Sequence, residues 1–427
     1  MDKAISVIKN IFKNKTTRNK IIFTLAILAL FRFTAHIPAP GIDRQSLQAI
    51  FNSSQFLTLL DVFSGGTLAN FSIMAVGLSP YISASIIMSM LSFILPQMEA
   101  LSKEGEYGRQ KINQYTRLIT IPLAAVQSIG LISLLNSQGL LVISDPFQII
   151  SIVITLSAGT MLIMWLGDLI TEYGVGNGVS ILIFAGIIAR LPISFIQTAT
   201  TVDAGSISNL LVFAGLSFAL IYIIVKTTQA ERKVPITYAR RSQRTSSTSR
   251  SNHLPLKLNQ AGVIPIIFAV SLMLIPSMVA NGLAGVDNPT IQQISSFVIA
   301  NFNQDGFFFN FFYFFLILGF TYFYTAITFN PEKIADQLKK SGAFIPGVRP
   351  GNSTAHYLSF ILNRTTLAGG VILGLIAITP TIFAQITNIT SISMGGTGLL
   401  IVVSVILETT KSVESQLVMH NYDKFLS

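Results

Sequence analysis

Apolar runs long enough to cross a membrane recur along this chain, and they restrict its fold more than any other feature. Hydrophobic residues make up 51% of the 427 residues and charged residues only 11%, whereas a soluble protein carries roughly a quarter charged residues. A helix needs roughly 20 apolar residues to span a bilayer. We therefore expect an all-α membrane protein. Hydropathy predicts ten transmembrane helices, near residues 21–38, 75–96, 117–136, 149–170, 178–196, 208–226, 260–282, 307–329, 365–386 and 398–416.

A short motif, Gly-x-x-Pro-x-Ile, occurs once in each half of the chain, at residues 77–82 and at residues 262–267. Each copy opens an apolar run of membrane-spanning length. Proline lacks a backbone donor and has a fixed φ, so it suits the start of a helix. Two membrane segments that begin alike indicate a duplicated bundle, whose working site lies near mid-membrane where the halves meet. Ile82 and Ile267 end the two motifs and are the first candidates for that site.

Lysines and arginines are concentrated on one predicted side of the membrane. The N-terminal tail, three loops and the C-terminal end hold 25 of the 28 if every span crosses once. Cytoplasmic loops carry an excess of these residues, so both termini are predicted to be cytoplasmic. Two of the basic loops, 226–258 and 331–364, are longer than connectors require. Glu231–Arg241 alternates as a hairpin would, and the glycines and prolines around Arg349 predict a fixed turn that displays it.

The sequence lacks the residue patterns of most catalytic and metal sites. It has no cysteine, its four histidines are scattered, and it contains neither a Gly-x-x-x-x-Gly-Lys phosphate loop nor a His-Glu-x-x-His zinc motif. ATP hydrolysis and zinc chemistry by this chain are therefore not expected. We predict no catalytic residue, no metal ion and no cofactor.

Residues 57–72, between the first two spans, fit neither a span nor a free loop. The segment is too short and polar to cross the membrane and too apolar to lie in water. Backbone at membrane depth has to be shielded from lipid, so we predict a half-helix that enters the outer cavity. Gly65 and Gly66 would allow this segment to bend and move.

Six short motifs then follow one another along the chain. They are Pro80-Tyr-Ile-Ser-Ala-Ser-Ile86, Lys103-Glu-Gly-Glu-Tyr-Gly-Arg109, Gly176-Asn-Gly-Val-Ser180, Leu254-Pro-Leu-Lys257, Ala261-Gly-Val-Ile-Pro265 and Gly347-Val-Arg-Pro-Gly351. In this order they resemble the SecY family, the channel subunits of the bacterial protein translocase. The resemblance extends from the first span, which contains Arg32, to the tenth, so it covers nearly the whole chain.

The resemblance implies a clamshell of two inverted, pseudo-symmetric halves of five helices each around an hourglass pore. The halves would comprise residues 21–196 and 208–416, with cytoplasmic tails at 1–20 and 417–427. The narrowest point of the pore in this family is a ring of aliphatic side chains. Transferred by motif, that ring comprises Ile82, Ile86, Ile183, Ile187, Ile267 and Ile401. Residues four apart share a helix face, which fits the two pairs from spans two and five.

The family also has a plug that closes the outer vestibule at rest. Residues 57–72 would form it, including Asp61, Phe63, Ser64, Gly65, Gly66 and Asn70. A lateral gate between spans two and three and spans seven and eight would release signal sequences and membrane helices into lipid. Asn259 and Gln260 open span seven and are candidates for polar contacts in the gate, with simple placement at the membrane interface as the favoured alternative.

The function implied by the resemblance is passage of unfolded preproteins across the bacterial plasma membrane. Arg240, Arg241 and Arg349 are assigned to docking, because the two long loops serve the motor ATPase SecA or the ribosome in this family. The other implied partners are SecE, SecG, signal-sequence-bearing preproteins and membrane lipids, with SecDF and YidC as further candidates.

Other classes of protein stay open from the residues alone. A secondary transporter for a small solute also uses inverted halves and broken helices, but it usually places charged or polar ligands at mid-membrane, where this chain has isoleucine. An intramembrane enzyme would need a nucleophile–base pair or metal ligands within its spans, and none is visible. An accessory paralogue with few substrates is the alternative within the family. Glu408, in the tenth span, is expected to face the cytoplasmic vestibule because a carboxylate in lipid is costly.

Overall fold

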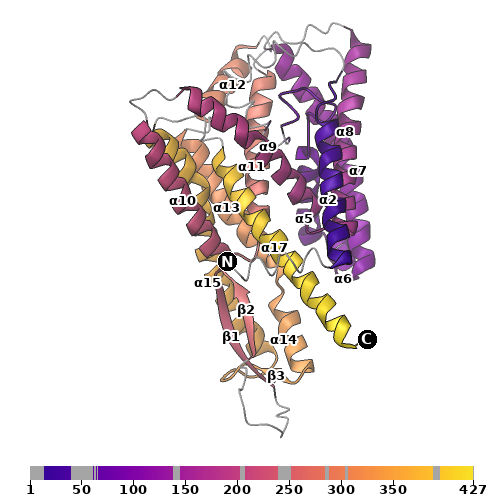
Figure 1. The fold of residues 1–427 in the computed structure, drawn as a ribbon, viewed down its shortest axis with the longest axis vertical. Helices are drawn as coiled ribbons and strands as arrows, with labels where there is room; N and C mark the ends of the chain where they lie inside the picture. Colours follow the sequence, from indigo (N-terminus) through magenta and orange to yellow (C-terminus); the bar gives the residue numbers. More distant parts are fainter. Residues whose placement is uncertain are drawn as a thin grey trace.

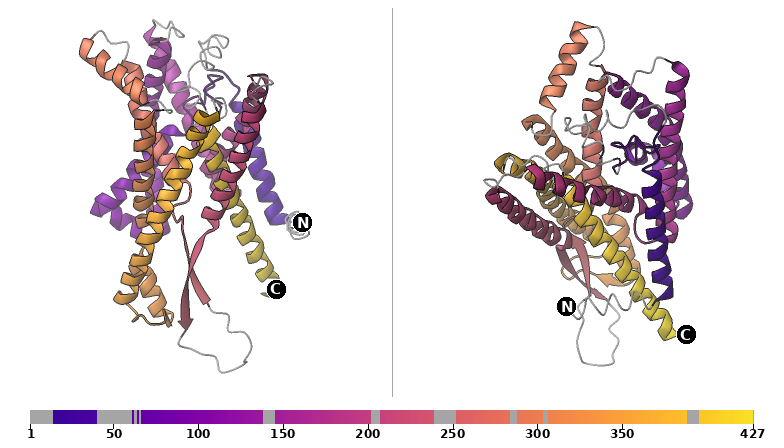
Figure 2. Two further views of the ribbon diagram at one scale, coloured as in Figure 1. Left: turned by 90° about the vertical axis from the view of Figure 1, so that its left-hand side faces the viewer. Right: turned by 45° about the horizontal axis from the view of Figure 1, so that its top comes forward.

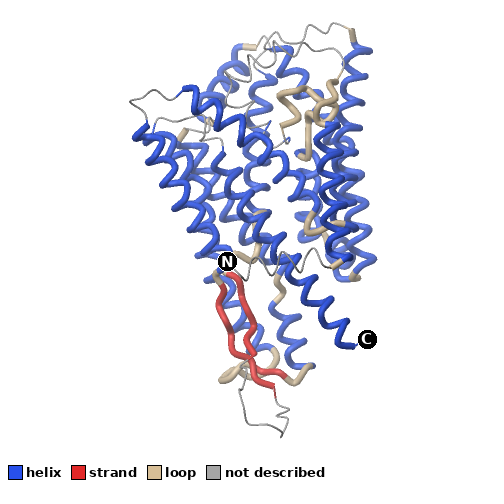
Figure 3. Tube along the Cα trace, in the orientation of Figure 1, coloured by secondary structure: helices blue, strands red, loops and turns tan. Residues whose placement is uncertain are grey.

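A bundle of long helices carries a small β-sheet at one end (Figure 1). Helices dominate the tube drawing, in which the sheet projects from the bundle (Figure 3). The structure is a computed structural model. It describes residues 14–39, 61, 64, 66–137, 145–201, 207–238, 252–283, 288–302, 306–387 and 395–426.

A helix coincides with each of the ten predicted spans. These helices are α2 (Lys15–Thr34), α5 (Ser79–Ile94), α7 (Glu106–Ser137), α8 (Pro146–Tyr173), α9 (Gly178–Thr201), α10 (Ile207–Gln229), α11 (Ile264–Leu283), α13 (Phe307–Thr328), α15 (Asn352–Thr387) and α17 (Gly395–Leu426). The start of α15 is well before the predicted residue 365. Arg364, directly before that residue, lies inside the helix, with its guanidinium 4.1 Å from the centroid of the Phe360 ring. Hydropathy marks only the apolar part of a helix, so it misses a polar extension of this kind.

Fewer than ten of these helices meet the length and hydropathy of a complete span. Within the described residues, α7, α8, α13 and α15 do so by themselves. A fifth span results if α5 is counted with α6 (Pro96–Lys103), which follows it after a bend of 98°. The described apolar parts of α9, α10 and α11 are shorter. The structure therefore shows an apolar helical bundle with several candidate spans.

Asparagine or aspartate followed by proline begins three of the helices. Asp145 accepts a hydrogen bond from the backbone of Phe147 at the start of α8, with a distance of 3.0 Å. Asn288 and Asn330 cap α12 (Pro289–Asn301) and α14 (Pro331–Lys340) in the same way. The side chain satisfies a backbone N–H at the helix start, and proline in the first turn has no N–H to satisfy. α12 and α14 were not predicted from hydropathy, although these cap pairs mark the start of both.

The two long basic loops meet in one three-stranded antiparallel sheet. β1 (Glu231–Tyr238) and β2 (Asn252–Lys257) form the predicted hairpin, and β1 also pairs with β3 (Ala343–Phe344) from the second loop. In this second pairing Tyr238 lies opposite Ala343. Val234, Leu256 and Ile345 pack with residues from the start of α15 into a small core of their own. The hairpin prediction is confirmed, but its union with the other loop was not predicted.

The largest cluster of buried apolar side chains lies inside the helical bundle. It combines residues from the first half of the chain, on α2, α5, α8 and α9, with residues on α10, α11, α13, α15 and α17. A second cluster joins residues near Phe71 to α7 and α8. The two halves meet where α11 packs against α5 and α7. Within the second half, α13 packs against α11 and α15. The sheet, α6 and the C-terminal end of α17 lie towards one end of the bundle, and α12 lies at the other (Figure 1).

Candidate functional site

Both copies of the Gly-x-x-Pro-x-Ile motif adopt the same backbone geometry. Gly77 and Gly262 each have a φ of 65°, a left-handed conformation that costs other residues roughly 1–2 kcal/mol. Pro80 and Pro265 are the second residues of α5 and α11. The prediction that each motif opens a helix is therefore confirmed.

The six isoleucines assigned to the pore, here called the isoleucine collar, lie within one buried cluster. They come from four helices and are at most 7% exposed: Ile82 and Ile86 on α5, Ile183 and Ile187 on α9, Ile267 on α11 and Ile401 on α17. Close packing supports this arrangement, because a Cβ added to Gly398 of α17 would lie 3.0 Å from Cγ2 of Ile187. All six are thus buried inside the bundle, and none of them lies on its outer surface.

The turn that holds Ile183 and Ile187 in place is the Gly176–Ser180 motif. Gly176 has a φ of 73°. The side chain of Asn177 accepts a hydrogen bond from the backbone N–H of Ser180 at 3.2 Å and so caps α9. A Cβ on Gly178 would collide with the carbonyl oxygen of Gly167. These residues allow α9 to turn back tightly against α8. The turn therefore sets the position of Ile183 and Ile187 along the axis of the bundle.

Part of the predicted plug is folded around Asp61. This side chain is fully buried, and its Oδ1 accepts a hydrogen bond from the backbone N–H of Ala69 at 2.6 Å. The N–H of Gly66 donates to the carbonyl of Asp61 at 2.7 Å, and the hydroxyl of Ser64 donates to the same carbonyl at 3.0 Å. Asn70 is half-buried. Phe63 and Gly65, with residues 57–60 and 62, lie outside the described residues.

The Asp61 turn packs directly on the first Gly-x-x-Pro-x-Ile motif. A Cβ on Gly77 would lie 2.6 Å from Cα of Ser64, so only glycine allows this approach. A Cβ on Gly159 of α8 would collide with the carbonyl oxygen of Ile73. The chain between the plug segment and α5 is therefore held between α8 and the turn around Asp61.

The predicted gate region contains a buried asparagine and a pair of aromatic rings. Asn259 is 5% exposed, and its Nδ2 donates a hydrogen bond to the carbonyl of Gly262 at 3.0 Å. Its Oδ1 is buried without a hydrogen-bond partner. Asn259 is therefore packed inside the protein, whereas Gln260 is half-buried. Phe93 of α5 and Phe323 of α13 meet edge to face, with ring centroids 5.9 Å apart.

At the sheet end, Arg349 is exposed on a turn that glycines define. Gly347 and Gly351 have φ values of 82° and 102°. The hydroxyl of Thr354 donates to the carbonyl of Arg349 at 2.9 Å and fixes the turn to the start of α15. The prediction of a rigid turn that displays Arg349 is confirmed. Arg240 and Arg241 lie outside the described residues.

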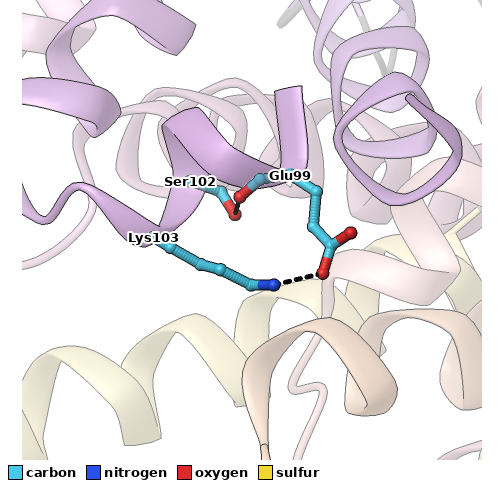
Figure 4. A network of polar contacts seen from close by, with 3 residues as sticks. All are labelled: Glu99, Ser102 and Lys103. Carbon is cyan, nitrogen blue, oxygen red and sulfur yellow. Dashed lines mark hydrogen bonds and ion pairs between the residues drawn. The ribbon is translucent and has the colours of Figure 1, made fainter. Parts of the chain in front are cut away.

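The motif of residues 103–109 forms the corner between α6 and α7. Nζ of Lys103 lies 2.5 Å from Oε1 of Glu99, and the hydroxyl of Ser102 donates to the carbonyl of Glu99 at 2.8 Å (Figure 4). The hydrogen bond from Lys103 lowers the pKa of Glu99. Gly105 has a φ of 76°, and a Cβ on Gly108 would collide with the carbonyl oxygen of Leu101. The glycines of this motif therefore make the corner, and the ion pair lies on its exposed side.

An ion pair between α7 and α8 was missed from the sequence. Nη2 of Arg117 lies 2.7 Å from Oδ2 of Asp168, and both side chains are partly exposed. Positions 51 residues apart carry no local signal of contact, although both had been placed near span ends. Among the described residues, no group of three His, Asp or Glu side chains converges as metal ligands would. Glu408 is exposed.

Comparison with known proteins explains why these features occur together. A sequence model of the SecY family matches residues 72–410. The protein translocase subunit SecY of Aquifex aeolicus is 44% identical over 435 residues, which cover 98% of this chain and 99% of that protein. The chain belongs to the SecY family. The resemblance carried by the six motifs is thereby confirmed, and so is the expected function of a protein-translocase subunit and not an enzyme.

Solved structures show the same fold at lower sequence identity. The structure described as "The plug domain of the SecY protein stablizes the closed state of the translocation channel and maintains a membrane seal" has a TM-score of 0.64 at 17% identity and covers 94% of this chain and 93% of its own. The structure of "Sec61 in the Canine ribosome-channel complex from the endoplasmic reticulum" has a TM-score of 0.62 at 15% identity, with the same coverage. The fold of this chain is thus the one that these SecY and Sec61 structures share.

Proposed function

We propose that this SecY protein is the protein-conducting channel of the general secretory pathway in a bacterial plasma membrane. It passes unfolded preproteins across the membrane and releases membrane helices sideways into lipid. The observation that carries this proposal is the isoleucine collar, six aliphatic side chains from four helices of both halves in one buried cluster. The family and the near-complete length of the match support it.

The chemistry of the collar suits a channel for polypeptide. A constriction that offers only apolar side chains excludes ions, because an ion that enters loses its hydration and gains no partner. The same surface makes no specific hydrogen bonds, so it accepts chains of any sequence. A small-solute transporter would instead require polar or charged ligands at this position, and the collar has none.

The proposed topology has ten spans in two inverted halves, residues 21–196 and 208–416, with both termini in the cytoplasm. The matched geometry of Gly77 and Gly262 supports the duplication. The sheet formed by the two basic loops lies towards one end of the bundle, and so do α6 and the end of α17 (Figure 1). This arrangement supports a single cytoplasmic side.

We further propose that the segment around Asp61 is the plug that closes the outer vestibule at rest. Its support is the packing of Ser64 on Gly77, five residues before the collar residue Ile82. Displacement of this segment would remove a contact on which the first turn of α5 depends. Opening of the plug and movement of α5 are thereby coupled.

The lateral gate is proposed to lie where α5 and α7 meet α11 and α13. Support comes from the packing of α11 against α5 and α7 and from the Phe93–Phe323 contact. Asn259 contributes a buried carbonyl oxygen that has no partner in this structure and is available to a polar group of a passing segment.

Arg349, with Arg240 and Arg241, is proposed to dock SecA or the ribosome on the cytoplasmic side. Exposure of Arg349 on a rigid turn supports this role, and so does a structural relative that is described in a ribosome-channel complex. SecE and SecG are the proposed subunit partners. Signal-sequence-bearing preproteins are the substrates, lipids surround the channel, and SecDF and YidC are further partners on the membrane.

Reconstitution tests the function directly. The full chain is purified with its associated subunits, placed in lipid vesicles and supplied with SecA, ATP and a preprotein. We expect the preprotein to become protected from added protease, whereas vesicles without the chain should protect none. R349E should reduce protection with wild-type thermal stability, and the exposed-lysine variant K340E serves as its charge control. A chain that protects no preprotein but accumulates a small solute would be a transporter.

A further inference from the structure

The segment between α11 and α13 contains a helix that the channel function leaves unexplained. α12 begins at a capped turn, in which Asn288 accepts a hydrogen bond from the backbone of Thr290 at 3.1 Å. It packs against α11, with Ser295 buried. Just past its end, the ring of Phe302 stacks on Phe312 of α13, with centroids 5.8 Å apart and planes at 16°. α12 is therefore a fixed element that joins the ends of two helices of the proposed gate.

One flank of α12 is apolar and unprotected. Ile294 is 61% exposed and Phe297 is 64% exposed. Residues three apart lie on the same side of a helix, so these two side chains form one patch. Ser296 is exposed and lies about 100° around the helix from Phe297. None of the 13 residues of α12 is charged. The polar side chains of the helix are thus amides and hydroxyls only, and Ile299, on the side away from Phe297, is 39% exposed.

The start of α13 is apolar and exposed as well. Phe307, Phe308, Phe311 and Phe312 there are each at least 46% exposed, and neighbouring rings among them contact one another. Contiguous exposed apolar surface marks a site of contact with protein or membrane. α12 lies at the end of the bundle opposite the sheet and extends away from the neighbouring helices (Figure 2). That is the level at which spans seven and eight reach the outer membrane surface in the proposed topology.

We propose that α12 lies in the outer lipid–water interface, with Ile294 and Phe297 inserted at the boundary between head groups and acyl chains. There it anchors the outer ends of α11 and α13. The inference rests on the membrane placement in the proposed function. Because α12 has no cationic side chain, its contact with lipid is apolar and needs no anionic head group. This distinguishes it from interfacial helices that use lysine and arginine.

The single tryptophan of the chain makes a direct test practical. Trp165 on α8 is 55% exposed. Both variants carry W165F, so that each has a single indole. F297W places the indole on the apolar side of α12, and S296W places it on the polar side. The full chain with its associated subunits is reconstituted in phosphatidylcholine vesicles. Indole emission is then measured with phosphatidylcholine brominated near either end of the acyl chain, and with aqueous iodide.

For F297W we expect quenching by the shallow bromines to exceed that by the deep bromines about twofold, because interfacial helices insert only roughly 5–10 Å. Anionic lipid should leave this ratio unchanged. S296W should be quenched by iodide. Quenching of F297W by iodide alone would overturn the proposal, and protection from both quenchers would assign the patch to a protein partner. The chain with only its natural Trp165 separates the two ideas: if bromolipid does not quench it, the membrane placement itself fails.

Discussion

Single glycines decide how closely the segment around Asp61 approaches the start of α5. Gly77 and Gly262 share a φ of 65°, but their surroundings differ. A Cβ at Gly77 would lie 2.6 Å from Cα of Ser64, whereas a Cβ at Gly262 would meet nothing within 4 Å. A substitution at Gly262 therefore tests the cost of the left-handed backbone alone. The same substitution at Gly77 adds the cost of a clash with Ser64.

We predict that G77A is more damaging than G262A. Each substitution costs roughly 1–2 kcal/mol for the left-handed backbone, but only G77A also displaces the turn around Ser64. Thermal unfolding in detergent should show a loss in both variants and a larger loss in G77A. Ion leak through planar bilayers should rise in G77A alone. Equal leak in both variants would contradict the proposed contact between plug and collar.

The collar itself gives a second prediction at this scale. I86G and I267G each remove an aliphatic side chain from the proposed seal, so resting ion conductance in planar bilayers should rise, because apolar bulk no longer keeps water out. Glycine also weakens a helix by about 1 kcal/mol. I87G provides the control for that effect, since Ile87 is the neighbouring residue on α5 and is 39% exposed. Unchanged conductance in I86G and I267G would remove these residues from the seal.

At the scale of elements, the sequence predicted what local signals encode. Apolar runs located a helix at every predicted span, and alternation located the β1–β2 hairpin. Local signals were also available for α12 and α14, in the pairs Asn288-Pro289 and Asn330-Pro331, but hydropathy does not detect a cap. β1 and β3 come from different loops, which α15 and the bundle bring together. No short stretch of sequence therefore predicts their pairing. The same holds for the ion pair between Arg117 and Asp168.

The joint sheet predicts that the two long basic loops act as one body. Tyr238 and Ala343 lie directly opposite each other in antiparallel strands, where Cβ atoms are about 4.5–5.5 Å apart. Since the chain has no cysteine, oxidation of Y238C/A343C should form one specific disulfide. The pair T237C/A343C, shifted by one residue, points to opposite faces and should not cross-link.

We expect SecA-driven export to be unchanged by this disulfide, because the sheet does not need to open. Export that falls on oxidation and recovers with a reducing agent would show that the loops separate during the cycle. Gel mobility reports the cross-link, and protease protection of a preprotein in vesicles reports export.

At the scale of the whole molecule, the question is what holds the two halves together at rest. Motif positions selected the six collar residues, and all six lie in one cluster of buried apolar side chains, while their role as a pore ring stays a prediction. The contacts between halves at the proposed gate were beyond sequence reasoning, because they depend on how α5 and α13 are rotated. Phe93 shows this: it is 61% exposed yet meets Phe323 edge to face. A contact on the lipid side of a gate is made when the gate is closed and lost when it opens.

We therefore predict that F93A and F323A ease opening of the gate. An edge-to-face pair contributes roughly 1 kcal/mol beyond its area, so its loss shifts the closed–open equilibrium about fivefold. Export of a preprotein with a weakened signal sequence should rise in either variant, and the double variant should add little more because both remove the same contact. I94A is the matched control, since Ile94 is the next residue on α5 and is 69% exposed. If I94A raised export as much as F93A, the effect would belong to the surface of α5, and the ring pair would not be the closure of the gate.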